Sequence, residues 1–179
     1  MLIPHPETHS GVVCDISTRI LRKSGGTLVV TYILEGDLDR LRIPAPRPPR
    51  VADELWRHTC CEIFIARKGV AGYHEFNLAP SGEWAAYAFE RYRERAAHHN
   101  EDAGRVDPQI AVRRTANRLE LDALIPLDRL SPLHVSNALS IALSVVVEDQ
   151  HGLLSYWALR HPPGKPDFHH AEAFALELE

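Results

Sequence analysis

Short runs of alternating apolar and polar residues, separated by turn residues, occupy most of this sequence. Residues 72–79 show the pattern most clearly: Tyr73, Glu75 and Asn77 fall on one face, and His74, Phe76 and Leu78 fall on the other. A period of two is typical of a β-strand with two different faces. The pattern predicts an all-β protein, a two-sheet antiparallel β-sandwich of jelly-roll or immunoglobulin-like type, with about ten strands and short helical turns.

Glycine, proline and asparagine mark the ends of these runs. We expect helical turns within 51–56 and 126–138, helical propensity at 91–97, and an extended surface loop at the prolines of 44–49. Neither an internal repeat nor a domain boundary is visible, so 1–179 is expected to form one domain, with 1–11 as a tail or loosely held edge. The expected strands are 15–23, 27–35, 59–67, 72–79, 83–91, 109–115, 118–125, 139–149, 153–160 and 173–178.

The stretch 55–93 carries charged and amide side chains inside its three expected strands. Glu62 lies in the middle of the apolar run 61–65, where a carboxylate is costly to bury unless it is hydrogen-bonded or paired. Glu75 and Asn77 are two residues apart and point the same way. If Glu62 shares their face, two carboxylates and an amide meet near Trp56 or Trp84, as in a small-ligand site. Alternatively, these are solvent-facing residues of a sheet exposed on one side.

Composition narrows the classes of protein to which this sequence can belong. The 179 residues have a net charge of −4 and a pI near 6.2, which gives no general affinity for nucleic acid. Three cysteines, two of them adjacent, argue against a disulfide framework. We see neither a signal peptide nor an apolar run of membrane-spanning length, so a cytoplasmic location and no membrane partner are expected.

Motifs for catalysis or metal binding are weak. The sequence has no zinc-ligand spacing, phosphate loop or dinucleotide fingerprint. Ser81 lacks the flanking glycines of a nucleophile elbow, and no base partner can be identified for the adjacent cysteines 60 and 61. The polar residues of 98–102 are typical of a surface loop rather than of a metal site. These observations favour a non-catalytic protein that binds a small molecule, and they leave the oligomeric state open.

Three long runs resemble a known family: LWRHTCCEIFIA, YHEFNLAPSGEWAAYAFERYR and LSYWALRHPPGKPDFHH. They are similar to bacterial DOMON-like proteins, which are related to the family 9 carbohydrate-binding modules. The resemblance spans residues 15–178. It implies a β-sandwich of about ten or eleven strands with a ligand cleft on one sheet. Relatives bind either sugars or haem.

The sugar-binding relatives clamp a sugar between aromatic rings and hydrogen-bond its hydroxyl groups with carboxylates, amides and an arginine. By that resemblance, Trp56, Trp84 and Trp157 are candidates for stacking, although a core position is favoured for Trp157. Carboxylate, amide and guanidinium groups are the candidates for the hydroxyl groups. The candidate ligand-binding set is Trp56, Glu62, Glu75, Asn77, Trp84, Arg160, His161 and His170.

Two alternatives stay open. Haem-binding relatives use a methionine and a histidine as axial ligands, whereas the only methionine here is Met1. A pair of histidines could replace them, drawn from His74, His161, His169 and His170. No resident cofactor is otherwise expected. The other alternative is a protein-interaction domain whose cleft is plugged by its own residues 162–170.

Overall fold

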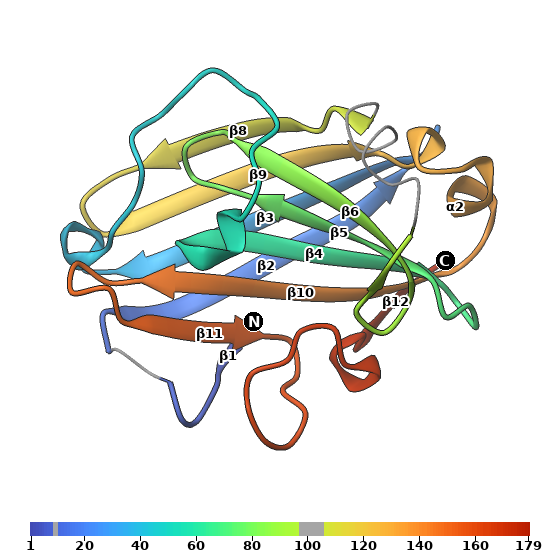
Figure 1. The fold of residues 1–179 in the computed structure, drawn as a ribbon. Coiled ribbons are helices and arrows are strands. Elements are labelled where there is room, and N and C mark those ends of the chain that lie inside the picture. Colours follow the sequence, from blue (N-terminus) through green and yellow to red (C-terminus); the bar gives the residue numbers. More distant parts are fainter. Residues whose placement is uncertain (9–10, 97–105) are drawn as a thin grey trace.

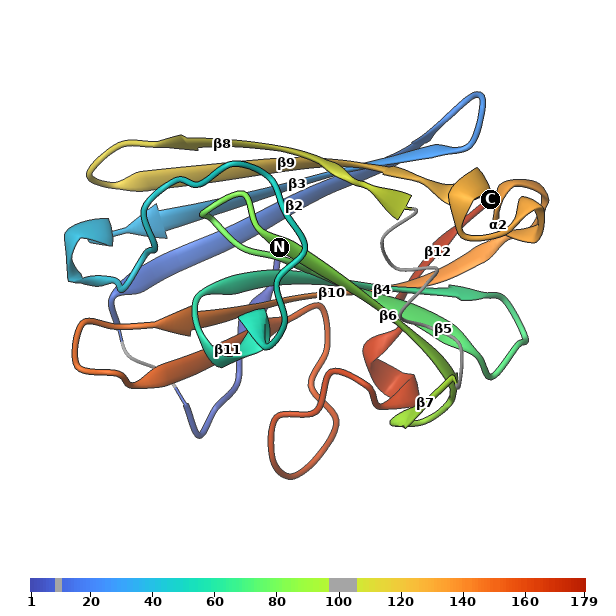
Figure 2. The same cartoon turned by 45° about the horizontal axis from the view of Figure 1, so that its top comes forward.

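A computed structural model describes residues 1–8, 11–96 and 106–179. In this part of the chain, two antiparallel β-sheets of eight and four strands pack face to face, with a few short helical turns at their ends. Figure 1 shows the strands of both sheets, and Figure 2 separates the two layers, with the four-stranded sheet above the eight-stranded one. The predicted all-β sandwich is confirmed.

The four-stranded sheet is built from two hairpins. Its order is β2-β3-β9-β8, so the second strand of each hairpin lies inside and the first lies at an edge. Gly25 and Gly26 make the β2–β3 turn with positive φ angles of 93° and 81°, a conformation that glycine adopts without a Cβ clash. The bounds are β2 Val13–Lys23, β3 Thr27–Gly36, β8 Gln109–Arg114 and β9 Arg118–Pro126.

The eight-stranded sheet has the order β1-β11-β10-β4-β5-β6-β7, with β12 also paired to β10. Strands β4, β5 and β6 form the predicted meander. The strand bounds are β1 Ile3–Pro4, β4 Cys60–Arg67, β5 Tyr73–Leu78, β6 Trp84–Arg91, β7 Glu94–Arg95, β10 Leu139–Glu148, β11 Leu154–Ala158 and β12 Leu176–Leu178. The helical turns are η1 Leu38–Arg40, η2 Leu55–Arg57, η3 Leu127–Arg129, α2 Pro132–Ser136 and η4 Ala171–Ala173.

Two local predictions need correction. In the described part of 91–97, residues 91–96, the expected helix does not form, because the chain turns at Arg93 (φ 56°) and β7 pairs back onto β6. Pairing along a sheet edge here overrides helical propensity. The strand expected at 173–178 is shorter, since η4 precedes β12. For the N-terminal segment, the structure selects the edge from the two expected alternatives, because β1 pairs with β11.

The main core lies between the two sheets and follows the alternation of the strands. Ile63 and Ile65 of β4 face Tyr32 of β3 and the apolar side of β9, and all are fully buried. The Tyr32 hydroxyl donates to the backbone carbonyl of Glu62 at 2.6 Å, which satisfies a polar atom inside the core. This bond fixes β4 against the second sheet directly beneath the Glu62 side chain.

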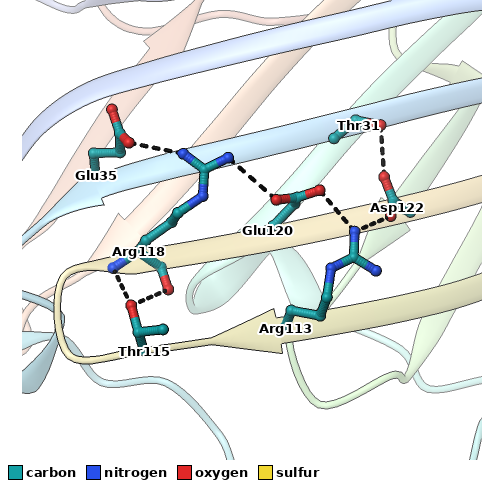
Figure 3. A network of polar contacts seen from close by, with 7 residues as sticks. All are labelled: Thr31, Glu35, Arg113, Thr115, Arg118, Glu120 and Asp122. Atoms are coloured by element: carbon teal, nitrogen blue, oxygen red, sulfur yellow. Dashed lines mark hydrogen bonds and ion pairs between the residues drawn. The ribbon is translucent and has the colours of Figure 1, made fainter.

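The outer faces of the two sheets differ in character. The outer face of the four-stranded sheet carries a chain of charged side chains, shown in Figure 3, in which Arg118 contacts Glu35 and Glu120, and Arg113 contacts Glu120 and Asp122. Such solvent-screened ion pairs contribute little to stability and keep the face solvated. The outer face of the eight-stranded sheet is instead apolar, and the candidate site lies there.

Candidate functional site

A second apolar cluster covers the outer face of the eight-stranded sheet. Phe64, Tyr73, Tyr87 and Phe89 come from the central meander, and Phe168 packs on them from the C-terminal loop. Residues of β4 are therefore buried on both faces of the sheet. Figure 2 shows the C-terminal loop in red beside the hairpin that carries β7. Because this loop covers only part of the face, a cavity is left next to it.

The cavity has a volume of about 640 Å³. This lies within the range of roughly 300–1,000 Å³ that is typical of small-molecule sites. Its floor comes from the sheet and its rim comes from η2, the β6–β7 hairpin and the C-terminal loop. The lining residues are Trp56, Arg57, Glu62, Glu75, Phe89, Arg93, Arg95, Val146, Leu154, Tyr156, Pro166, Phe168 and His169.

Two buried glutamates stand on the floor. Glu62 is 3% exposed and Glu75 is 5% exposed, and both line the cavity. In the β4–β5 register Glu62 is opposite Asn77, and Glu75 is opposite Phe64, so the glutamates are diagonal neighbours on one face. The alternation predicts that Glu75 and Asn77 share a face, and the β4–β5 register places Glu62 on that face as well.

Side chains beside the glutamates hold them in place. The Asn77 amide donates to Glu75 Oε1 at 2.8 Å, and the Ser144 hydroxyl donates to Glu62 Oε2 at 3.4 Å. Asn77 itself is fully buried and does not line the cavity. It therefore positions Glu75, whereas the sequence pattern predicts that it meets the ligand directly.

Burial changes the protonation of both acids. Burial, and then the nearby charge of Glu75, raise the pKa of Glu62 well above its ordinary value. Burial also raises the pKa of Glu75 to about 7, against the opposing effects of the Asn77 hydrogen bond and the Arg95 and Arg93 charges. A floor with at least one protonated carboxyl group can both donate and accept hydrogen bonds. This is the combination that hydroxyl groups of a ligand require.

His169 links the floor to the rim. Its Nδ1 lies 2.8 Å from the Tyr73 hydroxyl, and its Nε2 lies 3.7 Å from Glu75 Oε2. Burial, and then the Arg93 charge, lower the pKa of His169 to about 4, so the ring is neutral at neutral pH. The Arg93 backbone N–H also donates to the Tyr73 hydroxyl at 3.1 Å. Tyr73 therefore ties the β6–β7 turn and the C-terminal loop to the sheet.

Aromatic side chains form the walls. Trp56 in η2 is 42% exposed, which is unusual for an indole, and it lines the cavity with Phe89, Tyr156 and Phe168. The guanidinium of Arg57 lies 5.2 Å from the centre of the Trp56 ring. An exposed indole beside buried carboxylates is a suitable platform for the C–H face of a sugar.

Two predicted members do not reach the cavity. Trp84 pairs with Leu78 in the β5–β6 register, so its indole points between the sheets, where it is 3% exposed. The face of β6 beside Glu75 carries Tyr87 instead. Arg160 is exposed and outside the cavity lining, and no ion pair joins it to Glu62 in the described part of the chain. These two expectations are corrected. Trp157 also lies in the core, as favoured.

The two predicted histidines lie outside this cavity as well. His161 Nε2 lies 2.9 Å from the carbonyl of Ile3, at the β1 edge of the sheet. His170 caps η4, because its Nδ1 accepts from the backbone N–H of Glu172 at 3.2 Å. His161 thus has a structural role near the start of the loop between β11 and η4, and His170 has one at its end.

Sequence reasoning misses Arg93, Arg95, Tyr156 and Phe168 as lining residues. The run 91–95 alternates charges in the manner of an ordinary solvated face, and its contribution to a cavity depends on the tight turn into β7. His169 enters the sequence interpretation only as a candidate haem ligand. The residues 98–102 lie outside the described part of the chain.

A second cavity of about 800 Å³ shares His169 with the first, and Tyr73 is among its other lining residues. His170 also lines this second cavity. His169 and His170 are neighbours on one wall, so they do not present two nitrogens from opposite sides, as two axial haem ligands would. His74 packs against His134 elsewhere, with 5.0 Å between ring centres, and His161 lies at the β1 edge. The four histidines therefore do not provide an opposed pair.

No family model matches this sequence, and no curated protein matches it either. Among solved structures, the fold is similar to that of a "putative carbohydrate-binding protein" from Bacteroides uniformis, with a TM-score of 0.57 and 15% sequence identity. The similarity covers 89% of this chain and 75% of that one. No helix in the described residues is both long and apolar enough to cross a membrane. The structural likeness supports the β-sandwich architecture.

Proposed function

We propose that this chain is a non-catalytic binding module whose cavity over Glu62 and Glu75 takes a saccharide or a sugar-like ligand. The observation that carries the proposal is two buried carboxyl groups on the floor of an open cavity next to an exposed indole. Burying such groups is costly, so their retention in a cavity points to a binding role. A relation to DOMON-like proteins is part of this proposal, and the carbohydrate-binding name of the Bacteroides protein agrees with a saccharide ligand.

The C-terminal loop supports an open site rather than a plugged one. Pro166, Phe168 and His169 of this loop line the cavity and leave about 640 Å³ beside them. Asp167 anchors this loop to the β6–β7 turn, because its carboxylate accepts hydrogen bonds from Tyr92 at 2.6 Å and from Arg93 at 2.8 Å. A wall fixed in this way keeps the cavity formed before a ligand arrives, which lowers the entropic cost of binding.

The nearby nucleophile candidates favour binding over catalysis. Burial, and then the Glu62 charge, raise the pKa values of the Cys60 and Cys61 thiols well above the ordinary range. Thiols in that state are poor nucleophiles. The Ser144 hydroxyl is buried and donates to Glu62. We therefore assign the polar residues here to holding a ligand.

A glycan array followed by calorimetric titration tests the proposal. We expect weak, calcium-independent saccharide binding that falls about tenfold in Glu62→Gln, because an amide NH₂ group in place of a carboxyl oxygen leaves a buried hydrogen-bonding group at the ligand unsatisfied, at a cost of about 1–3 kcal/mol. Glu177→Gln is the matched control. Glu177 is an exposed acid paired with Lys68 and outside the cavity lining, so this change should leave binding unaltered. Failure of every saccharide to bind, or equal binding by Glu62→Gln, contradicts the proposal.

A further inference from the structure

Three arginines from three different segments line the same cavity: Arg57 in η2, Arg93 in the β6–β7 turn and Arg95 in β7. Against them stand only the two carboxyl groups of the floor among the lining residues. Among the lining residues, the charged side chains of the rim are therefore all positive. The chain as a whole is acidic, with a net charge of −4, so this local excess is opposite to the average surface.

Of the three arginines, Arg95 gives the strongest evidence for an anionic ligand. Its guanidinium carbon lies 4.3 Å from the centre of the Tyr87 ring, so the planar group is held by stacking. Within the described residues, no ion pair engages it. Stacking fixes the orientation of a guanidinium and leaves its N–H groups free for an acceptor. The Arg95 charge also lowers the pKa of Glu75, because the guanidinium is near enough to the floor to stabilise the ionised carboxylate.

The other two arginines are already oriented toward the rim. Arg93 donates to Asp167 at 2.8 Å while it lines the cavity, and its backbone has a left-handed φ of 56°. Strained backbone of this kind is often found at functional sites. Arg57 pairs with Glu54 at 2.8 Å, but both side chains are more than half exposed. A solvated pair of this sort gives up little stability when a ligand replaces one partner.

From this arrangement, and resting on the proposed saccharide site, we infer that the ligand is an acidic saccharide, whose ring hydroxyl groups meet Glu62 and Glu75 while its carboxylate meets the arginine rim. A carboxylate matches the planar fork of a guanidinium and can accept two parallel hydrogen bonds. The raised pKa values of the floor acids reduce the repulsion such a ligand would meet. A neutral sugar would leave the Arg95 guanidinium without an anionic partner among the described residues.

Paired titrations test this inference: glucose against glucuronate, and galactose against galacturonate, at pH 7 and low salt. We expect each uronate to bind about tenfold or more tightly than its neutral counterpart. We also expect this preference to shrink as salt is raised from about 50 to about 500 mM, since salt screens exposed charges. Glucose 6-phosphate and glucose 6-sulfate form a further arm that distinguishes a carboxylate from other anionic groups.

Arg95→Gln should reduce the ratio of uronate to neutral-sugar affinity by about tenfold. The control is Arg113→Gln, in which an arginine is removed from the outer face of the other sheet (Figure 3), and the ratio should not change. Uronates that bind no better than neutral sugars overturn the inference and leave the saccharide proposal standing. Preferred binding of the phosphate or sulfate overturns the choice of carboxylate. Absence of binding by any saccharide overturns both.

Discussion

Trp84→Ala is expected to lower the free energy of unfolding by about 3–5 kcal/mol, the usual cost of removing a large aromatic side chain from a packed core. The indole is 3% exposed and belongs to the core between the sheets. The backbone of Trp84 also bridges to the proline-rich loop, because its N–H donates to the carbonyl oxygen of Arg50 at 3.0 Å. Urea unfolding followed by circular dichroism measures the change.

Trp56→Ala is the matched comparison. We expect it to weaken saccharide binding and to leave stability almost unchanged, the opposite of Trp84→Ala. Its indole is 42% exposed on the cavity wall, so stability should change by no more than about 0.5 kcal/mol. Saccharide affinity should instead fall about tenfold, because a stacking surface is lost. If Trp84→Ala keeps its stability and loses only binding, the indole lies at the ligand and its assignment to the core is wrong.

Glu75→Gln is expected to raise the free energy of unfolding by about 3 kcal/mol at pH 8 and by less than about 1 kcal/mol at pH 5. The pKa of Glu75 rises from an ordinary 4.5 to about 7 in the folded protein. A raised pKa in the folded state means that stability is fully present below pH 4.5 and is lost as the pH rises through 7. Glutamine removes that loss because it is never charged.

Denaturant unfolding of both proteins at several pH values between about 5 and 8 measures this difference. Glutamine can still accept the hydrogen bond from Asn77, so the packing of the floor should be kept. Glu177→Gln, an exposed site, should show no comparable dependence on pH. A gain from Glu75→Gln that is the same at both ends of this range would show that Glu75 is not buried as described. Stability gained together with binding lost is what a functional acid should show.

Alternation within strands is enough to predict the sandwich and the shared face of Glu75 and Asn77, whereas the place of Glu62 on that face depends on the β4–β5 register. The alternation is a local feature of the sequence, and the structure follows it because one face of each strand must enter the core. The same pattern already separates Trp84 from Tyr87 within β6. What it cannot supply is the register with β5, which decides that Trp84 aligns with Leu78 and Tyr87 with Glu75.

The rim depends on contacts between segments distant in the sequence. Asp167 accepts from Tyr92 and Arg93, more than 70 positions earlier, and His169 reaches Tyr73 across 96 positions. No spacing rule predicts such contacts, because they follow from how the C-terminal loop returns over the sheet. For this reason the sequence prediction includes the adjacent His170 in the site and omits Phe168. The cytoplasmic location stays a prediction from the sequence.

The three tryptophans provide the most direct test of the central claim, that the cavity over Glu62 and Glu75 binds a ligand. Each indole N–H gives its own signal in a ¹H–¹⁵N NMR spectrum, and single Trp→Phe variants assign the signals. During titration with glucuronate, we expect the Trp56 signal to shift with saturation while those of Trp84 and Trp157 stay in place. A titration in which the Trp56 signal does not move, or in which only the two core indoles respond, would contradict the claim.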